Sequence, residues 1–154
     1  MKVLQFTIPV QGDKTVIINE EKLPFFYTHL HRHKEIQLTW VIKGEGTLVA
    51  GEYMQSFKPG DVYIIGANQP HVFKTGAAYL GKRNKQYVHS ISIYFDPKGS
   101  LLPLFQLPEM HTLKKLVQAT AAGLMVPDGK KEIIQQAIRE VQTSKGAGVV
   151  TSFL

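Results

Sequence analysis

Cysteine is absent from the 154-residue sequence. Disulfide bonds, thiolate zinc sites and cysteine nucleophiles are therefore excluded, and nothing in the composition points to an oxidising compartment. Long apolar runs are also lacking, because the N-terminal apolar stretch is interrupted by Gln5 and Pro9 and is too short for a signal-peptide core or a membrane span. These absences predict a cytoplasmic protein with no membrane segment.

Familiar catalytic motifs are missing as well. The sequence has no Gly-x-Ser-x-Gly nucleophile elbow and no Gly-x-x-x-x-Gly-Lys-Ser/Thr phosphate loop. Gly44-x-Gly46 lacks the strand-to-helix context of a dinucleotide site. The absence of these motifs excludes most enzyme classes.

Charged residues make up only 19% of the chain and apolar residues 44%, which is the balance of one folded domain. The net charge of +6 permits an anionic partner. No long basic tract or recognition helix is visible, so we expect solvated surface charge and no direct DNA binding by these residues.

Up to about Asp96 the sequence consists of short segments rich in β-branched and aromatic residues, separated by Gly, Pro, Asn and Asp. This pattern predicts a β-sandwich or small barrel. Lys58-Pro59-Gly60-Asp61 has the composition of a type II turn. The expected strands are Lys2–Ile8, Thr15–Asn19, Phe25–His31, Ile36–Ile42, Thr47–Ala50, Met54–Phe57, Val62–Ile65, His71–Lys74 and Gln86–Phe95.

After Pro97 the apolar period changes to that of helices. One amphipathic helix is predicted over Glu109–Leu124 and a second over Gly129–Val141, with Asp128 as its N-cap. We therefore divide the chain into a β-barrel at 1–97 and a helical segment at 98–154 packed on it. The last residues are apolar and lack a stop signal, so we expect a piece of a longer protein.

The histidines carry the most specific signal. Thr28-His29-Leu30-His31-Arg32-His33 places three imidazoles within five residues, and on a strand they would share one face. A His-x-His pair can present two nitrogens to one metal ion, and His71 from a later strand is the natural third ligand. His29, His89 and His111 are expected to have structural or surface roles, and Trp40 is expected on the outer face of the barrel.

The order His31-x-His33-x3-Gln37-x6-Gly44 followed by Gly51-x7-Pro59-Gly60-Asp61-x9-His71 resembles the two motifs of the cupin superfamily. That resemblance implies a mainly β fold, the double-stranded β-helix or jelly-roll barrel, here followed by two C-terminal α-helices. More narrowly, His31–Leu38, Phe57–Asp61 and Gly66–His71 are similar to the N-terminal sensor domain of AraC-type transcription regulators. In that family the DNA-binding half follows the sensor domain, and this sequence has no room for it.

One position departs from the motif. Metal-binding cupins carry a glutamate where this chain has Gln37, and a neutral amide binds divalent cations less well than a carboxylate. Glu35 could replace that carboxylate if the strand is regular. The leading hypothesis is therefore a ligand-sensing and dimerisation domain whose effector, a sugar or other polar metabolite, contacts His31, His33, Gln37 and His71.

In that hypothesis homodimers form through the helices, and DNA is bound only by the absent domain. The alternative is a stand-alone metal-dependent cupin enzyme of the dioxygenase or sugar isomerase type. There His31, His33 and His71 hold zinc, iron or nickel, with Gln37 or Tyr63 as an outer-shell group.

Overall fold

The computed structural model describes residues 2–9, 14–80 and 86–154. Short 3-10 turns at Ala77–Tyr79, Pro108–Met110 and Thr120–Ala122 join some of the elements. In chain order the strands and helices are β1 (Leu4–Gln5), β2 (Val16–Leu23), β3 (His31–Arg32), β4 (Ile36–Lys43), β5 (Gly46–Ala50), β6 (Tyr53–Phe57), β7 (Val62–Ile65), β8 (His71–Thr75), β9 (Val88–Phe95), α1 (Leu102–Phe105), α2 (His111–Ala119), β10 (Leu124–Met125), α3 (Asp128–Thr143) and α4 (Ala147–Phe153).

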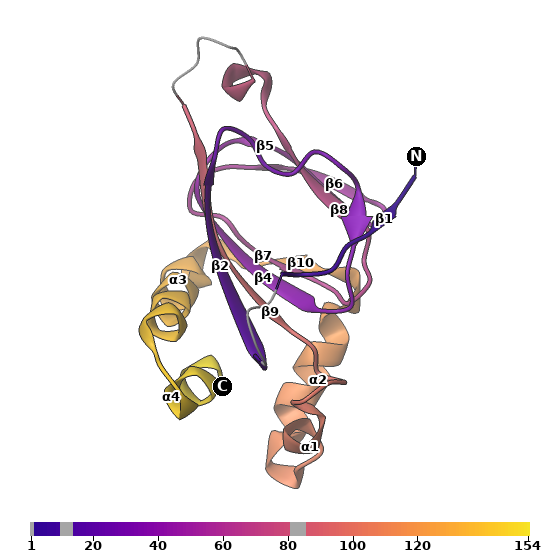
Figure 1. The fold of residues 1–154 in the computed structure, drawn as a ribbon, viewed down its shortest axis with the longest axis vertical. Coiled ribbons are helices and arrows are strands. Elements are labelled where there is room, and N and C mark those ends of the chain that lie inside the picture. The colour runs from indigo at the N-terminus through magenta and orange to yellow at the C-terminus, as the bar shows by residue number, and fades with distance from the viewer. Residues whose placement is uncertain (1, 10–13, 81–85) are drawn as a thin grey trace.

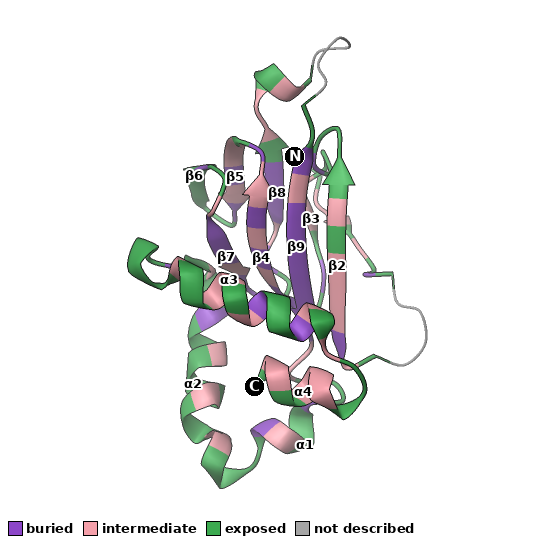
Figure 2. Cartoon of the chain, turned by 90° about the vertical axis from the view of Figure 1, so that its left-hand side faces the viewer, coloured by how far each residue is buried: buried purple, intermediate pink, exposed green. Residues whose placement is uncertain are grey.

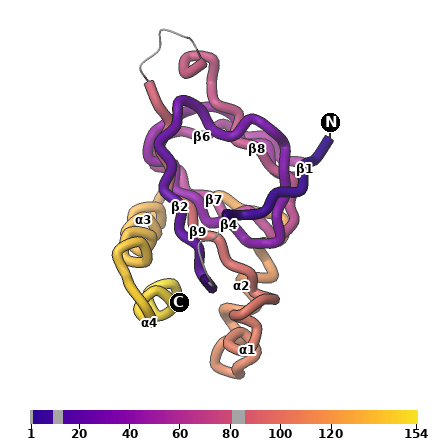
Figure 3. The backbone as a smooth tube through the Cα atoms, in the orientation of Figure 1, coloured from indigo at the N-terminus to yellow at the C-terminus, as the bar shows by residue number. Residues whose placement is uncertain are grey.

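Two five-stranded sheets face each other and close into a barrel with the helices outside it (Figure 1, Figure 3). Sheet A has the order β1-β3-β8-β5-β6, and sheet B has the order β10-β7-β4-β9-β2. All neighbours pair antiparallel except β1 and β3, which are parallel. The predicted mainly β barrel followed by helices is confirmed.

The two faces of sheet B contact different parts of the molecule, because side chains alternate along a strand. Its inner face looks into the barrel, where an apolar cluster around Val41, Phe57 and Tyr63 fills one end. Its outer face packs Val62, Ile91 and Ile93 against the helices. Figure 2 shows α3 lying across these strands, and β9 is buried along almost its whole length.

Helix α3 is held by its apolar stripe. Ile138 and Val141 are buried against sheet B, whereas Ile133 is 69% exposed. The sequence pattern places all of these in one stripe, but its first residue, Ile133, is turned away from the sheet. Trp40 lies on the outer face as predicted, with the Arg139 guanidinium 5.0 Å above its ring.

Glycine is required at Gly60 and Gly46 for two different reasons. Gly60 has φ +96° in the Lys58–Asp61 turn, as a type II turn demands, and the Lys58 N–H donates to the Asp61 carboxylate at 3.0 Å. At Gly46 in β5, an added Cβ would collide with the Lys74 carbonyl oxygen of β8. The close pairing of these two strands therefore depends on the missing side chain.

The predicted strand Phe25–His31 is wrong, because only His31–Arg32 pairs in a sheet. The Phe26 N–H donates to the side-chain hydroxyl of Thr75 in β8 at 2.9 Å and not to a backbone carbonyl, as ladder pairing would require. Phe26 is buried in the core, while Phe25 and Tyr27 are exposed. Alternation of exposure therefore occurs here in a loop that has no strand partner.

The helical segment also differs from the prediction. Within the described residues after Pro97, four helices replace the expected two, since α1 and α4 were not predicted. The helix expected over Glu109–Leu124 ends at Ala119, and Leu124 belongs to β10, which pairs with β7. Asp128 is the first residue of α3 and not its N-cap, and Pro127 occupies the cap position. Of the described helices, none has the length and hydropathy needed to cross a bilayer.

Candidate functional site

His31, His33 and His71 come together at one end of the barrel. His31 in β3 lies directly opposite His71 in β8, and their ring centroids are 4.3 Å apart. The His33 ring lies 5.0 Å from that of His71 and 6.0 Å from that of His31. One nitrogen from each residue lies within 4.8 Å of the other two. The structure thus brings together the three histidines that the sequence singled out.

A backbone carbonyl two residues away fixes the orientation of each ring. The Nδ1–H of His31 donates to the His29 carbonyl at 2.8 Å, and that of His71 donates to the Gln69 carbonyl at 2.8 Å. The Nδ1–H of His33 donates to the Glu35 carbonyl at 3.0 Å. Because each Nδ1 donates to a carbonyl, Nε2 is the nitrogen of each ring that remains for another partner. The backbone therefore fixes the orientation of three rings that lie close together.

Burial keeps two of these rings neutral. It lowers the pKa of His71 to about 3, with the neighbouring imidazoles of His31 and His33 opposing protonation further. It also lowers the pKa of His31 below its usual range. The Nε2 atom of His71 is buried and has no hydrogen-bond partner among the described residues. An unpartnered lone pair of this kind is a strong acceptor for an ion or a donor group.

Gln37 contacts the third imidazole from the inner face of β4. Its Oε1 atom lies 3.1 Å from His33 Nε2, and its NH2 group donates to the Thr39 hydroxyl at 2.6 Å. The Thr39 hydroxyl in turn lies 2.8 Å from the Ser92 hydroxyl. Gln37 therefore already contacts the nitrogen of His33 that an ion would use.

Glu35 lies on the other side of His33. Its carboxylate is 3.7 Å from Nδ1 of His33, away from the Nε2 atoms, and its side chain is buried. It is therefore not positioned as a ligand in place of the missing glutamate. A carboxylate behind a ligating histidine instead orients the ring and increases its basicity.

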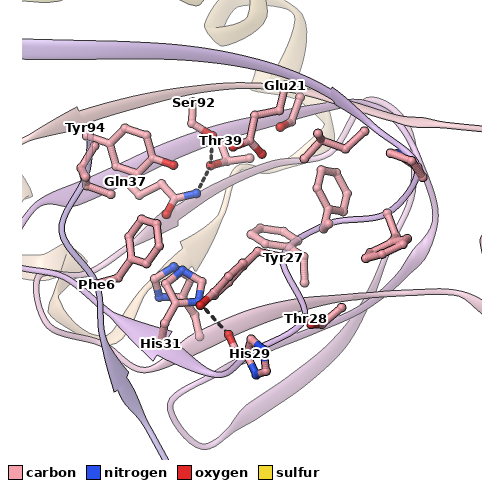
Figure 4. Close-up of a pocket in the computed structure, with 18 residues that line it drawn as sticks. Phe6, Glu21, Tyr27, Thr28, His29, His31, Gln37, Thr39, Ser92 and Tyr94 are labelled. Atoms are coloured by element: carbon pink, nitrogen blue, oxygen red, sulfur yellow. Dashed lines mark hydrogen bonds between the residues drawn. The ribbon is translucent and has the colours of Figure 1, made fainter. Parts of the chain in front are cut away.

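A cavity of about 470 Å³ opens beside the histidines. His31, His71 and Gln37 line it, as Figure 4 shows for His31 and Gln37, whereas His33 is not among the lining residues and contacts Gln37. Contact of an effector with these four residues stays a prediction. The volume is within the about 300–1,000 Å³ typical of small-molecule sites.

The floor of the cavity is a polar patch on sheet B that we did not predict. Adjacent strands place Asn19, Ser92 and Thr39 in one row and Tyr94 and Gln37 in the next. Burial raises the pKa of the Tyr94 hydroxyl, and the Glu21 and Glu35 carboxylates raise it further. The signal was present in β9, where Ser90, Ser92 and Tyr94 alternate with isoleucines. Polar side chains at every second position of a buried strand indicate a polar cavity.

Aromatic side chains form the remaining wall. The Phe6 ring lies 5.5 Å from Tyr27 and 5.4 Å from His31, and Tyr27 lies 5.0 Å from His31. Phe25, Phe26 and Phe73 also line the cavity. The site therefore combines an apolar wall with a polar floor, as small-molecule pockets generally do.

The other histidines are not part of the triad. His29 is exposed, lines the cavity and contributes its backbone carbonyl to His31. His89 lies on the outer face of sheet B, 2.7 Å from Glu20, and His111 is exposed in α2. Tyr63, considered above as an outer-shell group, donates its hydroxyl to Asp61 at 3.1 Å and therefore belongs to the core.

The donor set fits a divalent transition metal. Neutral imidazole nitrogens suit zinc, iron and nickel, and a buried lone pair such as that of His71 Nε2 is a suitable ligand. Two features weaken the fit: no carboxylate joins the three histidines, and Gln37 competes for His33. The residues can hold such an ion, with Gln37 as a neutral fourth group.

Comparison with known proteins gives the fold. The Cupin domain model matches residues 21–77, and no curated protein matches the sequence. Apo ToxT from Vibrio cholerae, in a variant form, is similar over 94% of this chain and 53% of its own, with 10% identity and a TM-score of 0.50. This chain thus spans about half the length of that protein.

Two further solved structures are similar over the barrel. A cupin protein from Bacteroides fragilis matches 62% of this chain and 86% of its own, with 14% identity and a TM-score of 0.43. A variant of oxalate decarboxylase from Bacillus subtilis matches 66% of this chain and 28% of its own, with 14% identity and a TM-score of 0.43. The domain match, the two-sheet barrel and the likeness to ToxT together show that this chain has the cupin fold.

Proposed function

We propose that this chain is the ligand-sensing and dimerisation domain of an AraC-type transcription regulator, and that a small organic molecule binds in its barrel. The observation that carries the proposal is the 470 Å³ cavity with an aromatic wall and a buried polar floor. Two further points support it: the resemblance of the histidine and Pro-Gly-Asp motifs, and a likeness to ToxT that includes the helices after the barrel. DNA binding belongs to a separate domain in this proposal.

In this function the ligand hydrogen-bonds to groups on both sheets. His71 Nε2 and His31 on sheet A are acceptors, and the hydroxyls of Thr39 and Ser92 on sheet B both donate and accept. Gln37 connects the two sets through His33. Each of these groups is fixed by protein hydrogen bonds, so little ordering entropy is lost when the ligand binds.

A thermal-shift screen of small metabolites, carried out with a chelator present, tests ligand binding. A ligand at 100 times its Kd adds about 2.7 kcal/mol to the stability of the folded state. Thr28 lines the cavity but is exposed, so Thr28→Trp should obstruct the opening without disturbing the core. Thr112→Trp on the exposed face of α2 is the matched control.

We expect ligands that raise the Tm of the wild type and of Thr112→Trp but not that of Thr28→Trp. A screen without ligands, or equal shifts in all three proteins, would contradict the proposal.

Dimerisation is proposed through the exposed apolar residues of the helices. The stripe of α3 is already used against sheet B, which leaves Leu116 in α2 and Ile133 in α3 exposed to solvent. A symmetric contact would bury them against the same surface of a second chain. Light scattering should give the mass of a dimer, and Leu116→Glu should give that of a monomer.

A second candidate function is that of a metal-dependent cupin enzyme. It is favoured by the three Nδ1–H groups held by backbone carbonyls, which leave three Nε2 atoms facing one point. When bound, the ion would supply Lewis acidity at the end of the cavity. His31, His33 and His71 would hold it, Gln37 would rotate away from His33 or offer its oxygen, and Glu35 would orient the His33 ring.

Metal analysis of the purified protein separates the two candidates. Stoichiometric zinc, iron or nickel that is lost in a His31→Ala, His71→Ala double variant and retained in His29→Ala would favour the enzyme. Under the sensor proposal we expect less than one ion per ten chains. In Gln37→Glu we expect metal affinity to rise about tenfold or more, because the variant supplies a carboxylate.

A further inference from the structure

We infer that the ligand of this cavity carries an amine and that Glu21 is its counter-ion. The inference rests on the proposed function, in which the cavity binds an organic molecule. It names the chemical class of that molecule from the charges and aromatic rings that line the site.

The charged side chain that lines the cavity is acidic. Glu21 is the acidic residue among those that line the cavity, and no lysine or arginine occurs among the lining residues that the structure describes. An anionic ligand would meet a carboxylate of its own sign and, among the described lining residues, no lysine or arginine. In a partly dehydrated space that contact costs free energy.

Glu21 is positioned by strand β2. It lies opposite Ser90 of β9 on the inner face of sheet B, and its carboxylate accepts a hydrogen bond from the Asn19 amide at 3.0 Å. Among the described residues it forms no salt bridge. Figure 4 shows Glu21 beside Ser92 and Thr39, on the side of the cavity away from His31. The carboxylate is half-buried and has no cationic partner among the described residues.

The neighbouring residue provides an internal contrast. Glu20 points to the outer face of the same strand, where it binds His89 at 2.7 Å and the Gln142 amide at 2.8 Å. Its carboxylate is therefore satisfied within the protein. Of the two adjacent carboxylates, the one that faces the cavity has room for an external cation.

The opposite wall suits the body of such a ligand. Phe6 and Tyr27 form an aromatic surface with His31, with ring centroids 5.0 to 5.5 Å apart. Aromatic faces bind both apolar rings and ammonium groups. An arylalkylamine would pack its ring on this wall and extend its ammonium group to Glu21, with the Thr39 and Ser92 hydroxyls as further acceptors.

Three probes with the same aryl chain test the inference: 3-phenylpropylamine, 3-phenylpropan-1-ol and 3-phenylpropanoate. Their binding is measured at pH 7.5, with a chelator present, by displacement of the uncharged dye N-phenyl-1-naphthylamine. We expect the amine to bind about tenfold or more tightly than the alcohol, since hydrogen bonds to a charged group contribute about 1.5–3 kcal/mol. The carboxylate should bind most weakly.

Glu21→Gln should weaken binding of the amine about tenfold and change the affinity of the alcohol less than about twofold. Glu20→Gln removes the same charge from the other face of β2 and should retain the preference for the amine. Equal affinities for the three probes, a preference for the carboxylate, or an amine preference that persists in Glu21→Gln would overturn the inference and leave the proposed function intact. Failure of the dye and of all three probes to bind would overturn both.

Discussion

Acidification should destabilise this fold through His71, whose ring is buried and whose pKa is lowered to about 3. In the unfolded chain the same imidazole has its ordinary pKa of about 6.5 and binds a proton as the pH falls below that value. The folded state does not bind this proton until the pH approaches 3. The contribution of His71 to stability is therefore complete above pH 6.5 and is lost progressively as the pH falls from 6.5 towards 3.

The size of the effect follows from the two pKa values. Each pH unit between them costs about 1.4 kcal/mol per proton, so His71 alone should remove about 2 kcal/mol between pH 7 and pH 5. The lowered pKa of His31 acts with the same sign. Other groups also titrate in this range, so the informative quantity is the difference between the wild type and a variant that lacks the titrating ring.

His71→Asn is the suitable variant, because its amide can still donate to the Gln69 carbonyl that Nδ1 contacts now. The free energy of unfolding is measured by urea denaturation at pH 5, 6 and 7 with a chelator present. The wild type should lose about 2 kcal/mol more than His71→Asn between pH 7 and pH 5. His111→Asn, at an exposed position of α2, should follow the wild type. Parallel curves for the wild type and His71→Asn would refute the reasoning.

Three further changes test the fold. Ile138→Ala removes a side chain that is 1% exposed between α3 and sheet B and should cost about 3 kcal/mol in urea denaturation, whereas Met54→Ala in β6, at 70% exposure, should change stability by less than about 0.5 kcal/mol. Gly46→Ala should prevent correct pairing of β5 with β8 and yield insoluble or molten protein by circular dichroism, while Gly129→Ala, which meets no atom nearby, should be neutral or stabilising by up to about 1 kcal/mol. Tyr63→Phe should cost about 1 kcal/mol in thermal unfolding, because it removes one hydrogen bond to Asp61 while Lys131 still binds that carboxylate.

The strands of the barrel were predictable where local signals agreed. Val62–Ile65 matches β7 to the residue, and Ile36–Ile42 differs from β4 by one residue. Both segments are rich in β-branched and aromatic residues, with Asp61 and Gly66 flanking the first and Gly44 following the second, and these signals are local. The loop at Phe25–Leu30 is similarly rich in aromatic residues but belongs to no strand. Strand pairing is a contact between distant segments, and one sequence does not contain that information.

The candidate site also has one part that the sequence predicted and one part that it did not. The spacing of His31 and His33 and the later His71 was enough to predict that the three would meet. The polar floor was missed, although Ser90, Ser92 and Tyr94 alternate visibly in the sequence, because serines in a strand are read as solvent-facing. Their burial depends on sheet A lying opposite, which is a property of the closed barrel. Likewise, the contact of Gln37 with His33 depends on the position of β4 between β7 and β9, which is set by strand pairing.

In the proposed sensor function, the placement of the helices determines which part of the barrel transmits ligand binding. The helices contact sheet B, with α3 on β7 and α4 on β2. On β4, Thr39 faces the cavity while Leu38 and Trp40 face the helices. Successive residues of a strand are about 3.3 Å apart and point to opposite faces, so a ligand that displaces Thr39 also displaces its neighbours. A ligand that hydrogen-bonds to His71 on sheet A and Thr39 on sheet B would change the distance between the sheets. Through β4 it would also change the position of α3 on sheet B. A ligand confined to the histidines would make no contact with β4 and would leave α3 where it is, since a ligand shifts an equilibrium only through contacts that differ between the two states.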